Sequence, residues 1–174
     1  GQIIQWFGTN TDITEQHQAE QALAKQTAFI GSILDSLPIH LAVIDHTGTI
    51  LQVNDAWNRF ASENLGPCRI ELLGVGVNYL DVLRKAAVSD GEVRKSLDGT
   101  EAVLAGNSTL FEQEYPCHAP SERRWFRMSV SPLSAGGGSA VITHLDITAR
   151  KVAEESKAFL AAIVTSSPDA IITK

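Results

Sequence analysis

Short runs rich in apolar, β-forming residues and bounded by polar turn residues predict the strands of this chain. Two β-rich runs, residues 41–45 and 49–53, are separated by a turn that contains Gly48, which is typical of a hairpin. Between these runs and the second half of the chain, apolar residues recur at helical spacing near residues 55–61, 79–83 and 91–105. Three more strands are expected, at residues 109–115, 124–133 and 139–147. Hairpin-joined strands with helices gathered between them predict an antiparallel α+β domain.

A short repeat divides the chain. The triplet Asp-Ile-Thr occurs at residues 12–14 and again at 146–148, and each copy precedes a helical stretch that ends near a proline, Pro38 or Pro168. Such a repeat is typical of a tandem array excised from a longer protein. We therefore expect the closing strand of a preceding unit over residues 1–14, a linker helix over 15–37, a complete domain over 38–148, a second linker helix over 149–166 and the start of a following unit over 167–174.

The first linker helix carries an apolar seam. Its members are four and three residues apart in turn, as in the a and d positions of a coiled coil: Ala19, Leu23, Gln26, Ile30, Ile33 and Leu37. This pattern predicts a homodimer through Leu23, Ile30, Ile33 and Leu37. A helix that packs on its own sheet would show a similar pattern and is the alternative.

Composition and charge exclude several classes of protein. The 174 residues are 44% hydrophobic and 20% charged, as in an ordinary folded protein. The net charge of −6 argues against a nucleic-acid partner. The longest apolar run, residues 158–164, is far too short to span a bilayer, so no direct membrane contact is expected. Two cysteines, Cys68 and Cys117, favour a reducing, cytoplasmic location.

Motifs for enzyme chemistry are missing from the sequence. The stretch Gly74-Val75-Gly76 lacks the third glycine of a dinucleotide-binding loop, and neither a phosphate-binding loop nor a nucleophile elbow occurs. The five histidines and two cysteines do not follow a zinc-binding spacing. We therefore expect no catalysis and no metal site in this chain.

Four stretches, in this order, resemble the PAS family of sensory-box domains: residues 41–45 with Gly48, 53–57, 124–133 and 146–148. The resemblance implies a five-stranded antiparallel sheet with helices over one face, around a small cavity. It also implies a non-catalytic sensor or interaction module of a multidomain bacterial signal-transduction protein, such as a sensor histidine kinase. Such a module passes a signal through its flanking helices to adjacent PAS and output domains. The alternative is a PAS scaffold for dimerisation or signal relay that binds no small molecule.

Strand alternation, combined with the resemblance, indicates which side chains line the cavity. Six residues of the strands are candidates: Ala42, Ile44, Phe126, Met128, Ile142 and His144. Val130 is expected on the same side of its strand as Met128. Tyr79 and Leu83, four residues apart on a helix, are expected to close the cavity, although all of the apolar candidates also fit a plain core. On the third strand the choice stays open between the face of Phe111 and Tyr115 and the face of Leu110, Glu112 and Glu114. Asp146 and Thr148 are expected to form the junction that transmits the signal.

The resemblance also disfavours two common cofactors. Flavin-binding PAS domains carry an Asn-Cys-Arg-Phe-Leu-Gln stretch, whereas this chain offers only Cys68 between Pro67 and Arg69. Haem-binding relatives place a histidine on the helix over the cavity, and residues 65–115 contain none. No cofactor is therefore predicted, and an unknown small ligand remains possible. His144 needs a polar neighbour, a water or a ligand, because an unpaired buried imidazole is costly.

Overall fold

Five strands form one antiparallel sheet in the order β2-β1-β5-β4-β3. The computed structural model describes residues 5, 12–65, 74–117, 123–133 and 137–166. Along the chain the elements are α1 (Thr14–Ser36), β1 (His40–Ile44), β2 (Ile50–Val53), α2 (Asp55–Leu65), α3 (Tyr79–Ala86), α4 (Gly91–Leu104), β3 (Phe111–Pro116), β4 (Trp125–Pro132), β5 (Ala140–Asp146) and α5 (Thr148–Ser166). The predicted α+β class, with a five-stranded antiparallel sheet and flanking helices, is confirmed.

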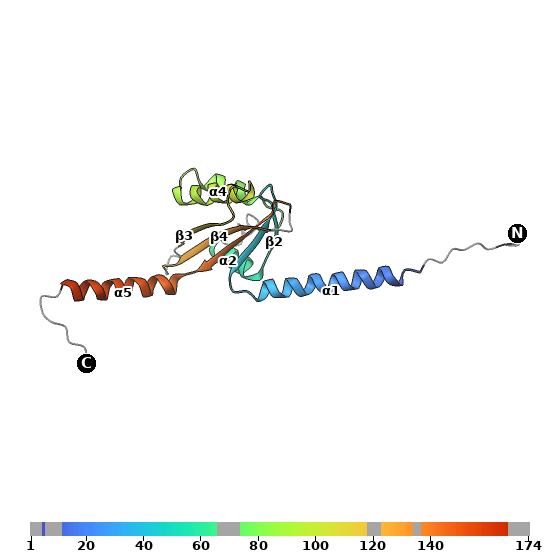
Figure 1. The fold of residues 1–174 in the computed structure, drawn as a ribbon, viewed down its shortest axis with the longest axis horizontal. Coiled ribbons are helices and arrows are strands. Elements are labelled where there is room, and N and C mark those ends of the chain that lie inside the picture. The colour runs from blue at the N-terminus through green and yellow to red at the C-terminus, as the bar shows by residue number, and fades with distance from the viewer. Residues whose placement is uncertain (1–4, 6–11, 66–73, 118–122, 134–136, 167–174) are drawn as a thin grey trace, which may run out of the picture.

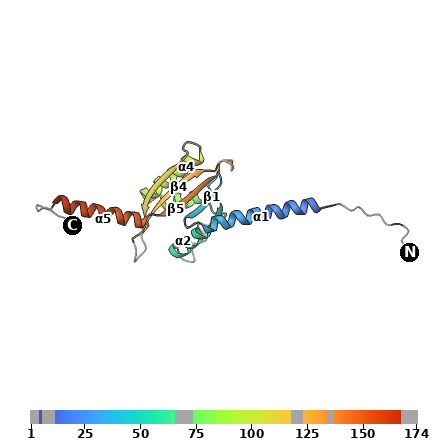
Figure 2. The ribbon, with the colours of Figure 1, turned by 60° about the horizontal axis from the view of Figure 1, so that its bottom comes forward.

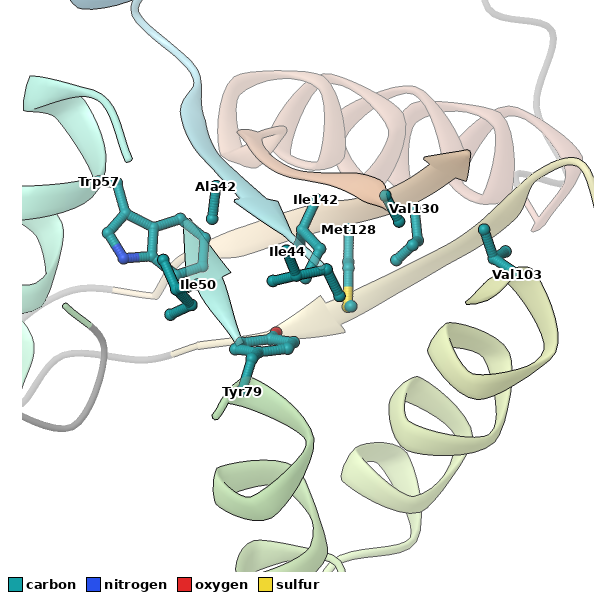
Figure 3. Close-up of a cluster of buried hydrophobic side chains, with 10 residues drawn as sticks. Ala42, Ile44, Ile50, Trp57, Tyr79, Val103, Met128, Val130 and Ile142 are labelled. Atoms are coloured by element: carbon teal, nitrogen blue, oxygen red, sulfur yellow. The ribbon is translucent and has the colours of Figure 1, made fainter. Parts of the chain in front are cut away.

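Strand alternation decides which face of the sheet is buried. On β4, alternate residues from Phe126 to Val130 are almost fully buried, and the residues between them are more accessible. Helices α2, α3 and α4 contribute Trp57, Tyr79 and Val103 to the same core, as Figure 3 shows. The strands contribute Ala42, Ile44, Ile50, Met128, Val130, Ala140 and Ile142. The helices thus cover one face of the sheet, and the hydrophobic core lies between them.

The two terminal helices project from the domain in opposite directions, as both ribbon views show (Figures 1 and 2). None of the residues of α1, all of which the structure describes, is buried, so the alternative of a helix packed on its own sheet is not found. The seam residues Leu23, Ile30 and Ile33 are exposed at 65%, 48% and 45%. Dimerisation through this seam stays a prediction.

One seam residue was placed wrongly by the sequence pattern. Leu37 lies beyond the end of α1 in an extended conformation, with φ −76° and ψ 132°. Pro38 follows it, and a proline disfavours helical conformation in the residue before it. Leu37 therefore cannot extend the helical seam, and the linker helix ends at Ser36 rather than at residue 37.

The proposed domain divisions at the two ends stay predictions. The closing strand of a preceding unit over residues 1–14 falls almost entirely outside the described residues, and the start of a following unit over 167–174 falls wholly outside them. The repeated triplets can be compared directly where they are described. Oδ1 of Asp12 accepts a hydrogen bond from the Thr14 amide at 2.9 Å, and Oδ1 of Asp146 accepts one from the Thr148 amide at 2.8 Å. Both copies therefore begin a helix in the same way.

Candidate functional site

A cavity of about 330 Å³ lies between the sheet and the covering helices. Side chains from β1, β3, β5 and from all three covering helices line it: His40, Trp57, Phe60, Ala61, Tyr79, Val82, Leu83, Val93, Tyr115 and His144. Six of these ten residues carry rings, and several of the rings contact one another. His40 stacks on Phe60 with centroids 4.4 Å apart, and Trp57 lies 5.6 Å from His144. The site is an aromatic, mostly apolar chamber.

A second cavity of about 210 Å³ adjoins the first and shares Tyr79, Leu83, Val93, Tyr115 and His144 with it. Its remaining lining is more polar and includes Asp90, Glu92, Ser96, Gln113, Pro116 and Met128. Gln113 is held in place, since its Nε2 donates to Oε2 of Glu92 at 2.8 Å and its Oε1 accepts from the Ser96 hydroxyl at 3.1 Å. We call the first chamber the aromatic cavity and the second the polar-sided cavity.

His144 stands at the wall between the two cavities. Its Nδ1 lies 2.7 Å from the hydroxyl oxygen of Tyr115, and the two rings meet edge to face at a centroid distance of 5.8 Å. Burial, with a smaller effect from nearby His40, lowers the pKa of His144 from 6.5 to about 3. The imidazole is therefore neutral at physiological pH, and its hydrogen bond to Tyr115 is one between uncharged groups.

The structure divides the predicted pocket residues into three groups. His144, Met128, Tyr79 and Leu83 line the cavities. Ala42, Ile44 and Ile142 point to the same side of the sheet but are fully buried core residues and line none of the cavities described above. Phe126 lines a separate polar hollow of about 270 Å³, together with Arg59 and Arg124. Their roles toward a ligand stay predictions.

Several lining residues were not among the candidates. On the third strand, the structure selects the face of Tyr115 and Phe111, which pack against the core, whereas Leu110 is 52% exposed. His40 lies two residues before Ala42, so extending the strand alternation by one step would have found it. Trp57 and Phe60 share one face of the predicted helix, but the sequence did not indicate that this face lines a cavity.

The predicted junction residues hold the start of α5. Asp146 caps the helix through the Thr148 amide, and the Oγ1 of Thr148 accepts a hydrogen bond from the Trp125 amide at 3.0 Å. The Ile147 amide donates to the carbonyl oxygen of Trp125 at 2.8 Å. The exit of β5 into α5 is therefore fixed to the first residue of β4.

A charge cluster adds a second attachment for α5. Glu114 on β3 pairs with Arg150, with Lys151 at 2.9 Å and with Arg127 at 3.3 Å. The hydrogen bond from Lys151 and the charges of Arg150 and Lys151 hold the pKa of Glu114 below its ordinary value. Lys151 also places its Nζ 5.5 Å from the ring centroid of Trp125. The first turn of α5 is thus bound to both β3 and β4.

Within the described ranges, no group of three His, Cys, Asp or Glu side chains is arranged to hold a metal ion. No helix in that part of the chain combines the length and the apolar character that a membrane span needs. Cys117 is half-buried, and burial raises the pKa of its thiol. Cys68 lies outside the described residues.

The sheet, the covering helices and the enclosed cavity define a sensory-domain fold, and comparison with known proteins identifies the family. The family model described as the PAS fold matches residues 34–152, well over half of the chain. The chain belongs to the PAS family.

The individual proteins that this chain is similar to are either dissimilar in most of their sequence or much longer than this chain. The chain is 41% identical over 119 residues to a 104.1 kDa protein in the hypE 3′ region of Rhodobacter capsulatus, an alignment that covers 67% of this chain and 12% of that protein. An RNA-binding light-oxygen-voltage receptor is similar in structure, with a TM-score of 0.54, 18% identity, and 80% of this chain and 38% of that chain covered. The PAS domain of Bordetella pertussis BvgS gives a TM-score of 0.46 at 17% identity, covering 83% of this chain and 98% of that one.

Proposed function

We propose that this chain is a sensor module that binds a small ligand in the aromatic cavity and passes the occupancy of that cavity to α5. In this proposal it works without catalysis of its own, as one unit of a longer signal-transduction protein such as a sensor histidine kinase. Its place is in the cytoplasm, between an adjacent PAS unit and a downstream output domain. The membership of the PAS family and the two projecting helices support this proposal.

One observation carries the proposal. Tyr115 and His144 are hydrogen-bonded to each other in the cavity. They lie one and two residues along the chain from Glu114 and Asp146, which hold the start of α5. Tyr115 faces the cavity, and its neighbour Glu114 pairs with Arg150 and Lys151. His144 faces the cavity, and Asp146, two residues later, caps α5. A ligand that displaces the bond between Tyr115 and His144 would therefore act on both attachments of the helix.

The size of the cavity favours a small ligand over a large cofactor. A volume of about 330 Å³ lies at the lower end of the range of ~300–1,000 Å³ for ligand pockets. Among the described residues, the only histidines that line the aromatic cavity are His40 and His144 on the strands, and none comes from the helices that cover it. The volume weighs against both haem and flavin, and the positions of the histidines weigh against haem held from the covering helices.

A scaffold that binds no small molecule is the second candidate. The exposed seam of α1 supports its dimerisation, because an apolar helix face of this kind needs a partner, and a second copy supplies the matching seam. The sensor and the scaffold both include the homodimer, so binding of a small ligand is the property that distinguishes them.

A two-part experiment tests the sensor. A thermal-shift panel of small molecules on the full chain identifies binders, and hydrogen exchange of residues 148–155 is then measured with and without a binder. The sensor requires a changed exchange rate in these amides, and the change should be absent in His144→Leu. A binder that leaves these amides unaffected contradicts transmission, and a panel without any binder favours the scaffold.

A further inference from the structure

The described lining of the aromatic cavity is polar in places but holds no carboxylate, ammonium or guanidinium group. No Asp, Glu, Lys or Arg is among the described residues that line it. Burial raises the pKa of both tyrosine hydroxyls, Tyr79 and Tyr115, and lowers the pKa of His144, so all three groups are neutral near pH 7. A charged ligand would lose its hydration here without meeting an opposite charge.

These groups retain unused hydrogen-bonding capacity. The bond between Tyr115 and His144 is the one hydrogen bond that either side chain makes to described residues. If Tyr115 donates to Nδ1, then Nε2 of His144 carries a proton to donate. If Nδ1 donates, the tyrosine hydroxyl proton is available instead, and Nε2 accepts. In either tautomer the pair offers one donor and one acceptor, and the Tyr79 hydroxyl makes no hydrogen bond to a described residue.

Aromatic rings form much of the wall of the cavity. Trp57 lies 6.2 Å from Tyr79 and 5.6 Å from His144 between ring centroids, and Phe60 stacks on His40. Such rings present faces and edges to a flat ligand. Contacts between aromatic rings are favourable in offset-stacked and edge-to-face arrangements. A cage for a quaternary ammonium needs the opposite arrangement, in which the rings stand apart around the cation.

Charged side chains lie outside this chamber. Arg59 and Arg124 line the separate polar hollow, and the stacked pair of His40 and Phe60 belongs to the walls of both spaces. Asp90 and Glu92 line the polar-sided cavity instead. The described lining of the aromatic cavity therefore offers no Asp, Glu, Lys or Arg side chain as an anchor for a charged ligand.

We infer that the ligand of the aromatic cavity is a small, uncharged aromatic molecule with a single hydrogen-bonding group, held at Tyr79, Tyr115 and His144. This inference rests on the proposed sensor function and specifies the chemical class that the sensor detects. The aromatic body replaces water against Trp57 and Phe60, while the polar group pairs with the unused donor and acceptor.

Five related compounds test the class by isothermal titration calorimetry on the full chain: 4-methylphenol, toluene, 4-methylcyclohexanol, 4-methylbenzoate and 4-methylbenzylammonium. Toluene lacks the hydroxyl group of 4-methylphenol, the cyclohexanol lacks its aromatic ring, and the other two compounds carry a negative or a positive charge. We expect 4-methylphenol to bind most tightly, with each of the others at least ~10-fold weaker, because each loses the polar group, the flat ring or neutrality. Equal or tighter binding of either ion, or of the cyclohexanol, overturns the inference while leaving the sensor intact.

Variants separate ligand contact from folding. Tyr79→Phe and Tyr115→Phe should weaken 4-methylphenol at least ~5-fold and leave toluene unchanged, since toluene makes no hydrogen bond. Arg59→Gln, in the separate polar hollow, is the matched control and should alter neither compound. If all five compounds fail to bind, the inference is wrong, whereas the sensor proposal fails only if the broader thermal-shift panel is also empty.

Discussion

The hydroxyl oxygen of Tyr115 lies 2.7 Å from Nδ1 of His144, although the two residues are on strands that are not neighbours in the sheet. Strand β4 runs between them, and its Met128 pairs with His144. The hydrogen bond thus passes across β4 on the cavity side. It joins the edge strand β3 to β5, the strand that leads into α5. A ligand in the cavity that breaks this bond would therefore change how β3 and β5 are held together.

The neutral state of His144 predicts a loss of stability in acid. Its pKa is lowered from 6.5 to about 3 in the folded chain, so between these values the unfolded chain binds a proton that the folded chain does not. As the pH is lowered through this window, the free energy of unfolding should decrease. His144 contributes at most about 1.4 kcal/mol per pH unit to this decrease. Urea denaturation of wild type and His144→Leu from pH 7 to pH 4 should show the smaller decrease in the variant. Parallel decreases would mean that His144 is protonated in the folded state.

Glu114 is predicted to hold α5 electrostatically. Replacing it by Gln removes the partner of Arg150 and Lys151, so hydrogen exchange in the first two turns of α5 should become faster while the strands keep their protection. The matched control is Glu112→Gln on the same strand, because Glu112 accepts a hydrogen bond from Ser129 at 2.9 Å and makes no described contact with α5. High salt screens these ion pairs, so in high salt the exchange rates of the wild type should approach those of Glu114→Gln. Equal exchange in both variants would contradict the attachment.

The order and type of the elements could be predicted from the sequence because short β-rich runs are bounded by turn residues such as Gly48, and helical spacing marks the segments between them. Strands 41–45 and 124–133 differ from β1 and β4 by one residue at each end. The end of α1 was missed at Leu37, since the apolar spacing continues into the residue that Pro38 forces out of the helix. In this case a local backbone restriction overrode the periodicity.

The cavity was harder to predict because tertiary packing decides it. In the expected strand over residues 109–115, Leu110 lies on one face and Phe111 and Tyr115 on the other, and in the structure β3 turns the second face toward the core and contacts α4. That contact is very close: a Cβ on Gly99 would lie 2.2 Å from the Phe111 ring, so a glycine is needed there. Nothing in the alternation of β3 reports this approach. Likewise, Ala42 and Ile142 have the right parity for a cavity but are enclosed by core neighbours.

The seam of α1 predicts a dimer that charge should disrupt. Ile30→Glu combined with Ile33→Glu places like charges in the seam, so sedimentation at tens of micromolar should show a dimer for the wild type and a monomer for the variant. Ala28→Glu with Ser32→Glu adds the same charge on a different face of α1 and should leave the dimer intact. A monomeric wild type, or a dimer that survives the seam substitutions, would show that the helix has another role.

Most of both terminal helices should be dispensable for folding. A chain trimmed to residues 27–153 keeps Leu34, which bonds to Asn54, and both Arg150 and Lys151, which bind Glu114. Because every removed residue whose burial is described is exposed, the trimmed chain should unfold in one cooperative transition with the denaturant dependence of the full chain. A lower slope or a second transition would show that the removed segments belong to the cooperative core.

Asn54 joins α1, β1 and α2 through a single buried side chain. Its Oδ1 accepts hydrogen bonds from the amides of Leu41 and Trp57, both at 3.0 Å, and the second of these caps α2. Its Nδ2 donates to the carbonyl oxygens of Leu34 at 3.0 Å and Ile39 at 2.8 Å. The residue is fully buried, so water cannot replace these partners.

Asn54→Ala should therefore lower the free energy of unfolding by about 2–4 kcal/mol, the sum of a lost cap and of buried groups left without partners. Asn58→Ala, on an exposed position of the same helix, is the control and should change it by less than about 0.5 kcal/mol. Hydrogen exchange adds a readout specific to the linker, because the last turn of α1 should lose protection in Asn54→Ala and keep it in Asn58→Ala. Equal stability of the two variants would mean that the Asn54 amide does not anchor the entering helix to the domain.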